Sequence, residues 1–180
     1  MKVFLDMDGV IADFHLGIYE AFKLKVDPYA MPVNFGIWHY EKVLGITLNE
    51  FWAVCTQEFF ENLKVTYDGY LIVEYLEQRF GRKNICILSS PPLDPTSMVG
   101  KHKWLVKHFP QYKRQFFFGT KKEFAAHNGS LLVDDADHNI DSFLEAGGNA
   151  FLYPRAWNKS YAYRGGALDR LVNYAEGLQC

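Results

Sequence analysis

The sequence predicts an α/β protein with a doubly wound parallel sheet of about five strands and one small, mostly helical insertion. Three observations lead to this prediction. Short apolar runs recur along the 180 residues, and segments with helical spacing of apolar residues separate them. Two of these runs end abruptly in paired carboxylates, at the edge where open α/β sheets place their ligands. In residues 27–65 the alternation stops, and aromatic residues crowd a stretch without a strand-like run.

The first predicted strand ends in two acids. Residues 3–5 form an apolar run typical of a buried strand, and Asp6 and Asp8 follow it, with Gly9 behind them. A glycine permits the backbone to turn sharply and to approach a ligand closely. An arbitrary Asp-x-Asp pair would lie in a solvated loop, but two like charges held this close at a buried strand end need a cation to offset their repulsion. We therefore expect Mg²⁺ beside Asp6 and Asp8.

The segment 27–65 is predicted to be a small helical subdomain inserted into a core formed by residues 1–26 and 66–180. Thr47 and Glu50 have the spacing of a capping box at a helix start. Most aromatic residues of the segment would form its own core. Because so small a subdomain has little interior, a few rings should face a cleft and stack on a planar group such as a nucleobase. The candidates for this stacking are Phe14, Trp38 and Trp52.

The rest of the chain alternates between helical and strand-like patterns. Helical spacing covers residues 13–25, 67–79, 96–109, 139–146 and 167–177, and strand-like runs cover residues 84–88, 116–118, 130–133 and 150–153. This alternation is typical of a parallel sheet with helical crossovers, which should be right-handed.

A second pair of acids, Asp134 and Asp135, follows the run 130–133. The carboxyl ends of parallel strands lie at one edge of a sheet, so these acids should lie close to Asp6 and Asp8. Such an arrangement makes an oxygen-rich pocket of the kind that hard divalent ions prefer.

These motifs resemble those of the haloacid dehalogenase (HAD) superfamily of phosphatases. Residues 6–10, Asp-Met-Asp-Gly-Val, are similar to its first motif, residues 89–91, Ser-Ser-Pro, to its second, and residues 131–135, Leu-Leu-Val-Asp-Asp, to its fourth. Together with the aromatic insertion, they are most similar to the 5'(3')-deoxyribonucleotidases. The resemblance implies a Rossmann-like core, a type 1 cap that closes over the site, and a Mg²⁺-dependent phosphate monoester hydrolase.

The resemblance also implies roles for the four acids. Asp6 is the nucleophile that takes up the phosphoryl group, and Asp8 is the general acid and base. The metal is held by the Asp6 carboxylate, the Asp8 backbone carbonyl and Asp135. Asp134 would hold the catalytic lysine or a metal-bound water.

The phosphate needs hydroxyl and cationic partners. Ser89 matches the residue whose hydroxyl bonds a phosphate oxygen in the family, and Ser90 would add its hydroxyl or backbone N–H. A lysine neutralises the phosphate and the charge of the transition state. Lys122 lies after the third strand, where nucleotidase-like members place this lysine. Lys121 is its immediate rival, and Lys101 is a weaker one.

The composition excludes several classes of function. The net charge of −2 argues against a large basic surface, so we expect no stable nucleic-acid complex. No apolar stretch approaches the length of a membrane span, and three cysteines without CxxC spacing fit free thiols, so we expect a soluble, cytoplasmic protein. The six histidines are dispersed and expected on the surface or in loops, which disfavours zinc. A P-loop and a Gly-rich dinucleotide fingerprint are both absent.

The sequence thus predicts a 5'(3')-deoxyribonucleotidase that acts on a small-molecule phosphate monoester, with a nucleoside monophosphate as the first candidate. The alternatives are a phosphatase that acts on nucleic-acid ends or on sugar phosphates and, from another class, a non-catalytic nucleotide-binding or regulatory protein with the HAD fold. The preferred base and sugar, the position of the phosphate and the oligomeric state, monomer or homodimer, stay open.

Overall fold

The fold is built on a parallel sheet of five strands. A computed structural model describes residues 1–25, 27–30 and 35–178. The strand order in the described chain is β3-β2-β1-β4-β5, and each neighbouring pair is parallel. The strands are β1 (Lys2–Leu5), β2 (Ile85–Ser89), β3 (Phe116–Phe118), β4 (Ser130–Asp134) and β5 (Asn149–Leu152). The predicted doubly wound α/β fold is confirmed.

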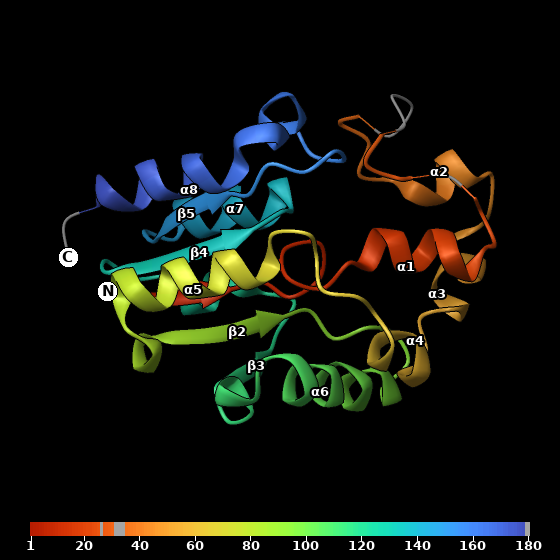
Figure 1. Ribbon diagram of the computed structural model, residues 1–180, viewed down its shortest axis with the longest axis horizontal. Coiled ribbons are helices and arrows are strands. Elements are labelled where there is room, and N and C mark those ends of the chain that lie inside the picture. Colours follow the sequence, from red (N-terminus) through yellow and green to blue (C-terminus); the bar gives the residue numbers. More distant parts are fainter. Residues whose placement is uncertain (26, 31–34, 179–180) are drawn as a thin grey trace.

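Two groups of helices surround this sheet, one along its faces and one beyond the carboxyl ends of the strands (Figure 1). The first group consists of α5 (Gly69–Phe80), α6 (Thr96–His108), α7 (Asp137–Glu145) and α8 (Ala167–Glu176), with 3₁₀ turns η2 (Arg82–Asn84), η3 (Pro110–Tyr112), η4 (Lys122–Ala125) and η5 (Tyr161–Gly166). The second group consists of α1 (Phe14–Ala21), α2 (Tyr40–Leu44), α3 (Leu48–Ala53) and α4 (Gln57–Glu61). Among the described residues, every helix is too short or too polar to cross a membrane.

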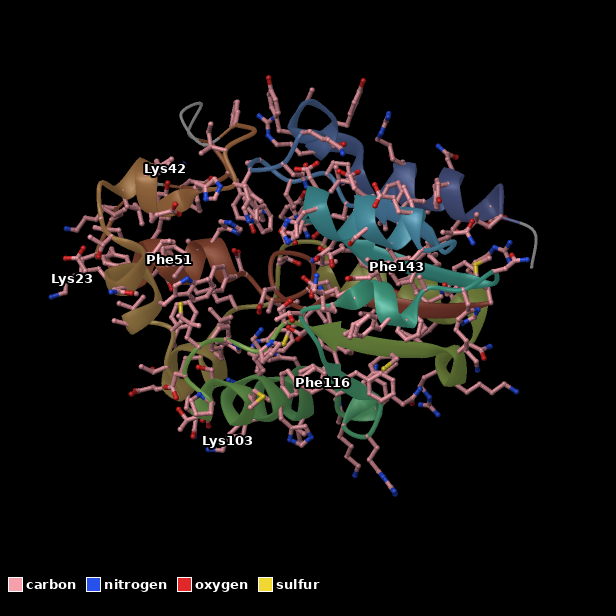
Figure 2. The ribbon with its side chains drawn as sticks, turned by 180° about the vertical axis from the view of Figure 1, so that it is seen from behind. Lys23, Lys42, Phe51, Lys103, Phe116 and Phe143 are labelled. Atoms are coloured by element: carbon pink, nitrogen blue, oxygen red, sulfur yellow. The ribbon has the colours of Figure 1, made fainter. Side chains whose placement is uncertain are left out.

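The two faces of the sheet bury different side chains because successive residues of a strand point to opposite sides. Val3 and Leu5 of β1 belong to the main core, which also includes Leu76 of α5. On the opposite face, Leu132 of β4 packs in a second cluster with Phe143 of α7. Figure 2 shows Phe143 over this face of the sheet. Helices on both faces explain why the strands read as continuous apolar runs in the sequence.

Two of the helices beyond the strand ends, α3 and α4, begin with side-chain caps that the sequence encodes. Thr47 and Glu50 form the predicted capping box, in which the Glu50 backbone N–H donates to Thr47 Oγ1 at 3.2 Å and the Thr47 N–H donates to Glu50 Oε2 at 2.8 Å. The Thr56 hydroxyl accepts from the Phe59 N–H at the start of α4.

The division of the chain into a core and an inserted cap subdomain, residues 27–65, stays a prediction. Residues 26, 31–34 and Cys180 lie outside the described residues.

Helix α4 packs closely against α6, with a glycine at the contact. A Cβ on Gly100 would lie 2.2 Å from the backbone oxygen of Gln57. Nearby, the Ser97 hydroxyl donates to the Cys55 carbonyl at 2.6 Å, and the Trp104 indole donates to the Leu63 carbonyl at 2.8 Å. These contacts fix one side of the second helix group to the helix that follows β2.

We expect Gly100→Ala to destabilise the fold, because the new methyl group would meet backbone atoms that cannot move aside. Overpacking of this kind costs about 1–3 kcal/mol of unfolding free energy. Gly165→Ala is the matched control, since a Cβ there meets no atom within 4 Å. Urea denaturation followed by circular dichroism measures both variants. A urea midpoint for Gly100→Ala equal to that of the wild type would contradict this expectation, because it would show that α4 and α6 can move apart without loss of stability.

Candidate active site

Acids from two adjacent strands come together at the carboxyl edge of the sheet. Asp6 directly follows β1, and Asp134 and Asp135 lie at the end of β4, which pairs with β1 in parallel. One carboxylate oxygen from each of the three residues lies within 4.8 Å of the others, and all three side chains are buried. This close grouping of like charges requires positive charge nearby.

Lys122 supplies part of that charge. Its Nζ donates to Asp6 Oδ1 at 2.5 Å and to Asp134 Oδ2 at 2.6 Å, and its side chain is 1% exposed. Burial alone would lower the pKa of Lys122, but the attraction of Asp134 and Asp6 outweighs it and raises the pKa above the ordinary lysine value. Asp134 also accepts from the Ala136 backbone N–H at 2.8 Å and from Asn139 Nδ2 at 3.1 Å. Its carboxylate is therefore engaged by three donor groups and fixes the lysine.

Three carboxylates and one ammonium group leave a formal charge of −2 in this cluster when the acids are ionised. Burial, followed by the charges of Asp134 and Asp8, raises the pKa of Asp6 to about 7 against the opposing effect of Lys122. Burial, together with the negative charges of Asp134 and Asp6, also raises the pKa of Asp135. Oxygen-only donors with excess negative charge fit a hard divalent cation such as Mg²⁺.

The turn after β1 leaves room for this cluster. Gly9 has a φ of +75°, and a Cβ there would lie 2.1 Å from Asp135 Oδ2. Only a glycine therefore lets the Asp135 carboxylate lie against the turn. Asp8 Oδ1 is buried, and within the described chain it has no hydrogen-bond partner. Both features are typical of a site that binds an ion or a ligand.

A second lysine lies on the other side of the turn. Lys101 Nζ donates to Asp8 Oδ2 at 2.5 Å, to Ser89 Oγ at 2.8 Å and to the Ser90 carbonyl at 2.8 Å. Its side chain is buried, so the lysine ranked last from the sequence lies in the site. Lys121, in contrast, does not reach the cluster. Its side chain is 69% exposed and pairs with Glu123 at 3.5 Å.

A cavity of about 320 Å³ opens over these charges. Its lining contains most of the predicted site residues and several that were not predicted. Those predicted are Asp6, Asp8, Phe14, Trp38, Trp52, Ser90, Lys101, Lys122, Asp134 and Asp135. Ser89 and Lys121 are not in the lining, and Ser89 instead accepts from Lys101.

One wall of the cavity is aromatic. Phe14 packs face to face with Phe60, at 6.0 Å between ring centroids and 21° between planes, and Trp52 lies 6.5 Å from Phe14. Phe51 also lines the cavity, and Figure 2 shows it within the helix group beyond the strand ends. Trp38 also lines the cavity, is 38% exposed and has its ring edge-on to His138, at 5.7 Å between ring centroids.

The expectation that every histidine lies on the surface or in a loop is wrong for His15. This residue is 6% exposed, lines the cavity and stacks on Trp157, at 3.4 Å between ring centroids and 23° between planes. Burial, with a smaller contribution from Arg155, lowers the pKa of His15 well below the ordinary histidine value. His15 therefore stays neutral. Its apolar neighbours in α1 gave the only sequence signal for its burial.

Sequence reasoning also missed the segment after β5. Arg155 is buried and donates to the carbonyls of Gly9 and Val10, both at 2.7 Å, and to both oxygens of Asp68. Trp157 and Asn158 reach Asp135. The signal that could have found them is topological, because the segment follows the carboxyl end of a strand that neighbours β4.

The comparison with protein families agrees with this geometry. Residues 1–165 match the family described as 5' nucleotidase, deoxy (pyrimidine), cytosolic type C protein, NT5C. The chain belongs to this family. The resemblance to HAD phosphatases is thereby confirmed, and this NT5C chain is a hydrolase of the phosphatase and nucleotidase class.

The NT5C chain is similar in fold to solved structures of hydrolases. One is the HAD-hydrolase YfnB from Bacillus subtilis bound to magnesium, with a TM-score of 0.50 and 15% identity, covering 83% of this chain and 84% of that chain. Another is a phosphonoacetaldehyde hydrolase-like protein from Oleispira antarctica, with a TM-score of 0.51 and 16% identity, covering 96% of this chain and 84% of that chain. At these identities the likeness shows a shared fold. The search of curated proteins found no match.

We expect acid to destabilise this NT5C chain in part through His15. The unfolded chain takes up a proton at this residue below about pH 6.5, whereas the folded chain does not. The contribution of His15 to the free energy of unfolding is therefore fully present above that pH. It decreases as the pH falls, by at most about 1.4 kcal/mol per pH unit. His15→Phe retains a ring against Trp157 and should flatten the slope of unfolding free energy between about pH 6.5 and 5. Urea titrations across this range measure both slopes, and equal slopes would contradict the assignment.

Proposed function

We propose that this NT5C chain is a Mg²⁺-dependent 5'(3')-deoxyribonucleotidase that hydrolyses nucleoside monophosphates through an aspartyl-phosphate intermediate. The observation that supports this most is the pairing of two lysines with two aspartates on the floor of an aromatic-walled cavity, Lys122 with Asp6 and Lys101 with Asp8. With a divalent cation on the acids, the floor with its two lysines would suit a phosphate, and the apolar wall suits the base that a nucleotide carries.

Asp6 is the proposed nucleophile. One of its carboxylate oxygens attacks phosphorus in line, and the bond between phosphorus and the ester oxygen breaks. Asp8 gives a proton to the departing alcohol. Asp8 then takes a proton from a water molecule, which attacks the aspartyl-phosphate and releases inorganic phosphate and free Asp6. The two acids differ in exposure, because the Asp8 side chain is 24% exposed and the Asp6 side chain 8%. One Asp8 oxygen also has no partner in the described chain, so Asp8 is the acid placed to exchange a proton.

The two lysines offset the phosphate charge in this scheme. Lys122 is fixed by Asp134 and approaches the site from η4, while Lys101 approaches from α6. Together they place positive charge near the equatorial oxygens of the transferring group. All three N–H donors of Lys101 are engaged by Asp8, Ser89 and Ser90. A phosphate oxygen would therefore replace one of these acceptors, and Ser89 would act through the lysine.

The cation would be held by Asp6, Asp135 and the backbone carbonyl of Asp8. Asp134 is the weaker candidate as a ligand, because it already accepts from Lys122, Ala136 and Asn139. When bound, Mg²⁺ supplies charge neutralisation on the phosphoryl oxygens. The Asp6 carboxylate would be shared between Lys122 and this cation, which keeps it ionised and oriented.

We expect Mg²⁺-dependent phosphate release from nucleoside monophosphates, and we expect Asp6→Asn to reduce kcat by at least about 10³-fold because the nucleophile is lost. The measurement uses deoxynucleoside and ribonucleoside 5'- and 3'-monophosphates, sugar phosphates and a 3'-phosphorylated oligonucleotide, each with and without Mg²⁺. Retained activity in Asp6→Asn would overturn the nucleophile assignment. A preference for the oligonucleotide or for sugar phosphates would overturn the nucleotide assignment, and no activity on any substrate would favour a regulatory protein.

We expect the aromatic wall to act on the base. Stacking of a base on an aromatic side chain contributes about 1–3 kcal/mol, so Trp52→Leu should lower the ratio of kcat/KM on a deoxynucleoside monophosphate to kcat/KM on glycerol phosphate by about 5- to 150-fold. Leucine retains apolar volume against Phe14 and Phe51. Steady-state kinetics on both substrates measure the ratio. An equal loss on both would mean that Trp52 supports the fold and does not contact the base.

A further inference from the structure

Two consecutive residues of the segment after β5 hold Asp135. Trp157 Nε1 donates to Asp135 Oδ2 at 2.6 Å, and Asn158 Nδ2 donates to the Asp135 backbone carbonyl at 2.9 Å. Both residues are fully buried. The carboxylate and the main chain of Asp135 are thus held separately by neighbouring side chains.

The indole is a suitable donor for a carboxylate that must keep its charge. It has one N–H and no acceptor, so its hydrogen bond favours the ionised form of the acid. It is also neutral. A lysine at this point would cancel one of the negative charges left by the three carboxylates and Lys122, and would compete with a cation for Asp135. The indole orients the carboxylate without lowering the affinity of the cluster for a divalent ion.

The ring itself is held firmly. The imidazole of His15 stacks on Trp157, and the ring of Tyr29 lies 5.5 Å from it. Two residues earlier, Arg155 bonds the carbonyls of Gly9 and Val10. The same short segment therefore ties Asp135 to the turn that carries Asp8. A donor on so constrained a segment fixes the direction of the carboxylate.

We propose that Trp157 is a positioning residue for the metal site, whose indole N–H orients the Asp135 carboxylate toward a divalent cation. This inference rests on the proposed Mg²⁺ site at Asp6 and Asp135. Partners that orient a metal ligand are worth about 10- to 100-fold in metal affinity.

The test compares Mg²⁺ binding to the wild type, Trp157→Phe and Trp104→Phe by isothermal titration calorimetry of the intact chain. Phenylalanine at position 157 keeps a ring against His15 but removes the N–H and part of the indole volume, and Trp104→Phe removes the same atoms elsewhere in the core. Trp104 is the matched control, since it is also fully buried and also donates one hydrogen bond, to the Leu63 carbonyl. We expect Trp157→Phe to weaken Mg²⁺ binding by about 10-fold or more. Trp104→Phe should lower the unfolding midpoint and leave Mg²⁺ binding unchanged.

The outcomes separate this inference from the proposed function. If the wild type does not bind Mg²⁺, the proposed metal site and the role of Trp157 both fail. If the wild type binds and Trp157→Phe binds equally well, only the role of Trp157 fails. If Trp157→Phe does not fold, the ¹⁵N-labelled wild type decides, because the indole N–H resonance of Trp157 must shift when Mg²⁺ is added. An unmoved resonance overturns the inference.

Discussion

The mutual repulsion of four buried or half-buried aspartates at one edge of the sheet is the constraint on which the rest of the site depends. Asp6 and Asp8 follow β1, and Asp134 and Asp135 lie at the end of β4. In a buried setting, like charges this close cannot all stay ionised without positive charge or hydrogen-bond donors. Each carboxylate accordingly has a partner. Asp6 and Asp134 share Lys122, Asp8 has Lys101, and Asp135 has the indole of Trp157.

The partners of these acids come from elements that are far apart in the sequence. Lys101 comes from α6, Lys122 from η4 and Trp157 from the segment after β5. Parallel strands make this convergence possible, since every strand delivers its following loop to the same edge. The turn after β1 lies at the centre of this edge. Arg155 donates hydrogen bonds to the carbonyls of Gly9 and Val10 in this turn. Gly9 permits the conformation of the turn, and Arg155 holds it in that conformation.

A feature could be predicted from the sequence when the residues that form it lie close together along the chain. The sheet, the paired acids and the capping box at Thr47 were predictable because each is encoded in a run of a few residues. The position of Lys101 beside Asp8 was not predictable, because it depends on α6 and on the packing of α6 against α4. His15 and Trp157 were missed because their partners are each other and Asp135, contacts that no local pattern reports.

The glycine contact between α4 and α6 has a consequence for how this enzyme can diverge. Gly100, which touches the backbone of Gln57, is the residue before Lys101, whose ammonium group pairs with Asp8. A change that moves α4 therefore also moves a cation of the reaction centre. Helices α2 and α3 carry cavity residues such as Glu41 and Trp52, and in the described part of the chain they contact α6 far less than α4 does. Substitutions that change the substrate preference should thus cost the least stability in α2 and α3. Helix α4 is constrained, because it contacts the helix that carries Lys101.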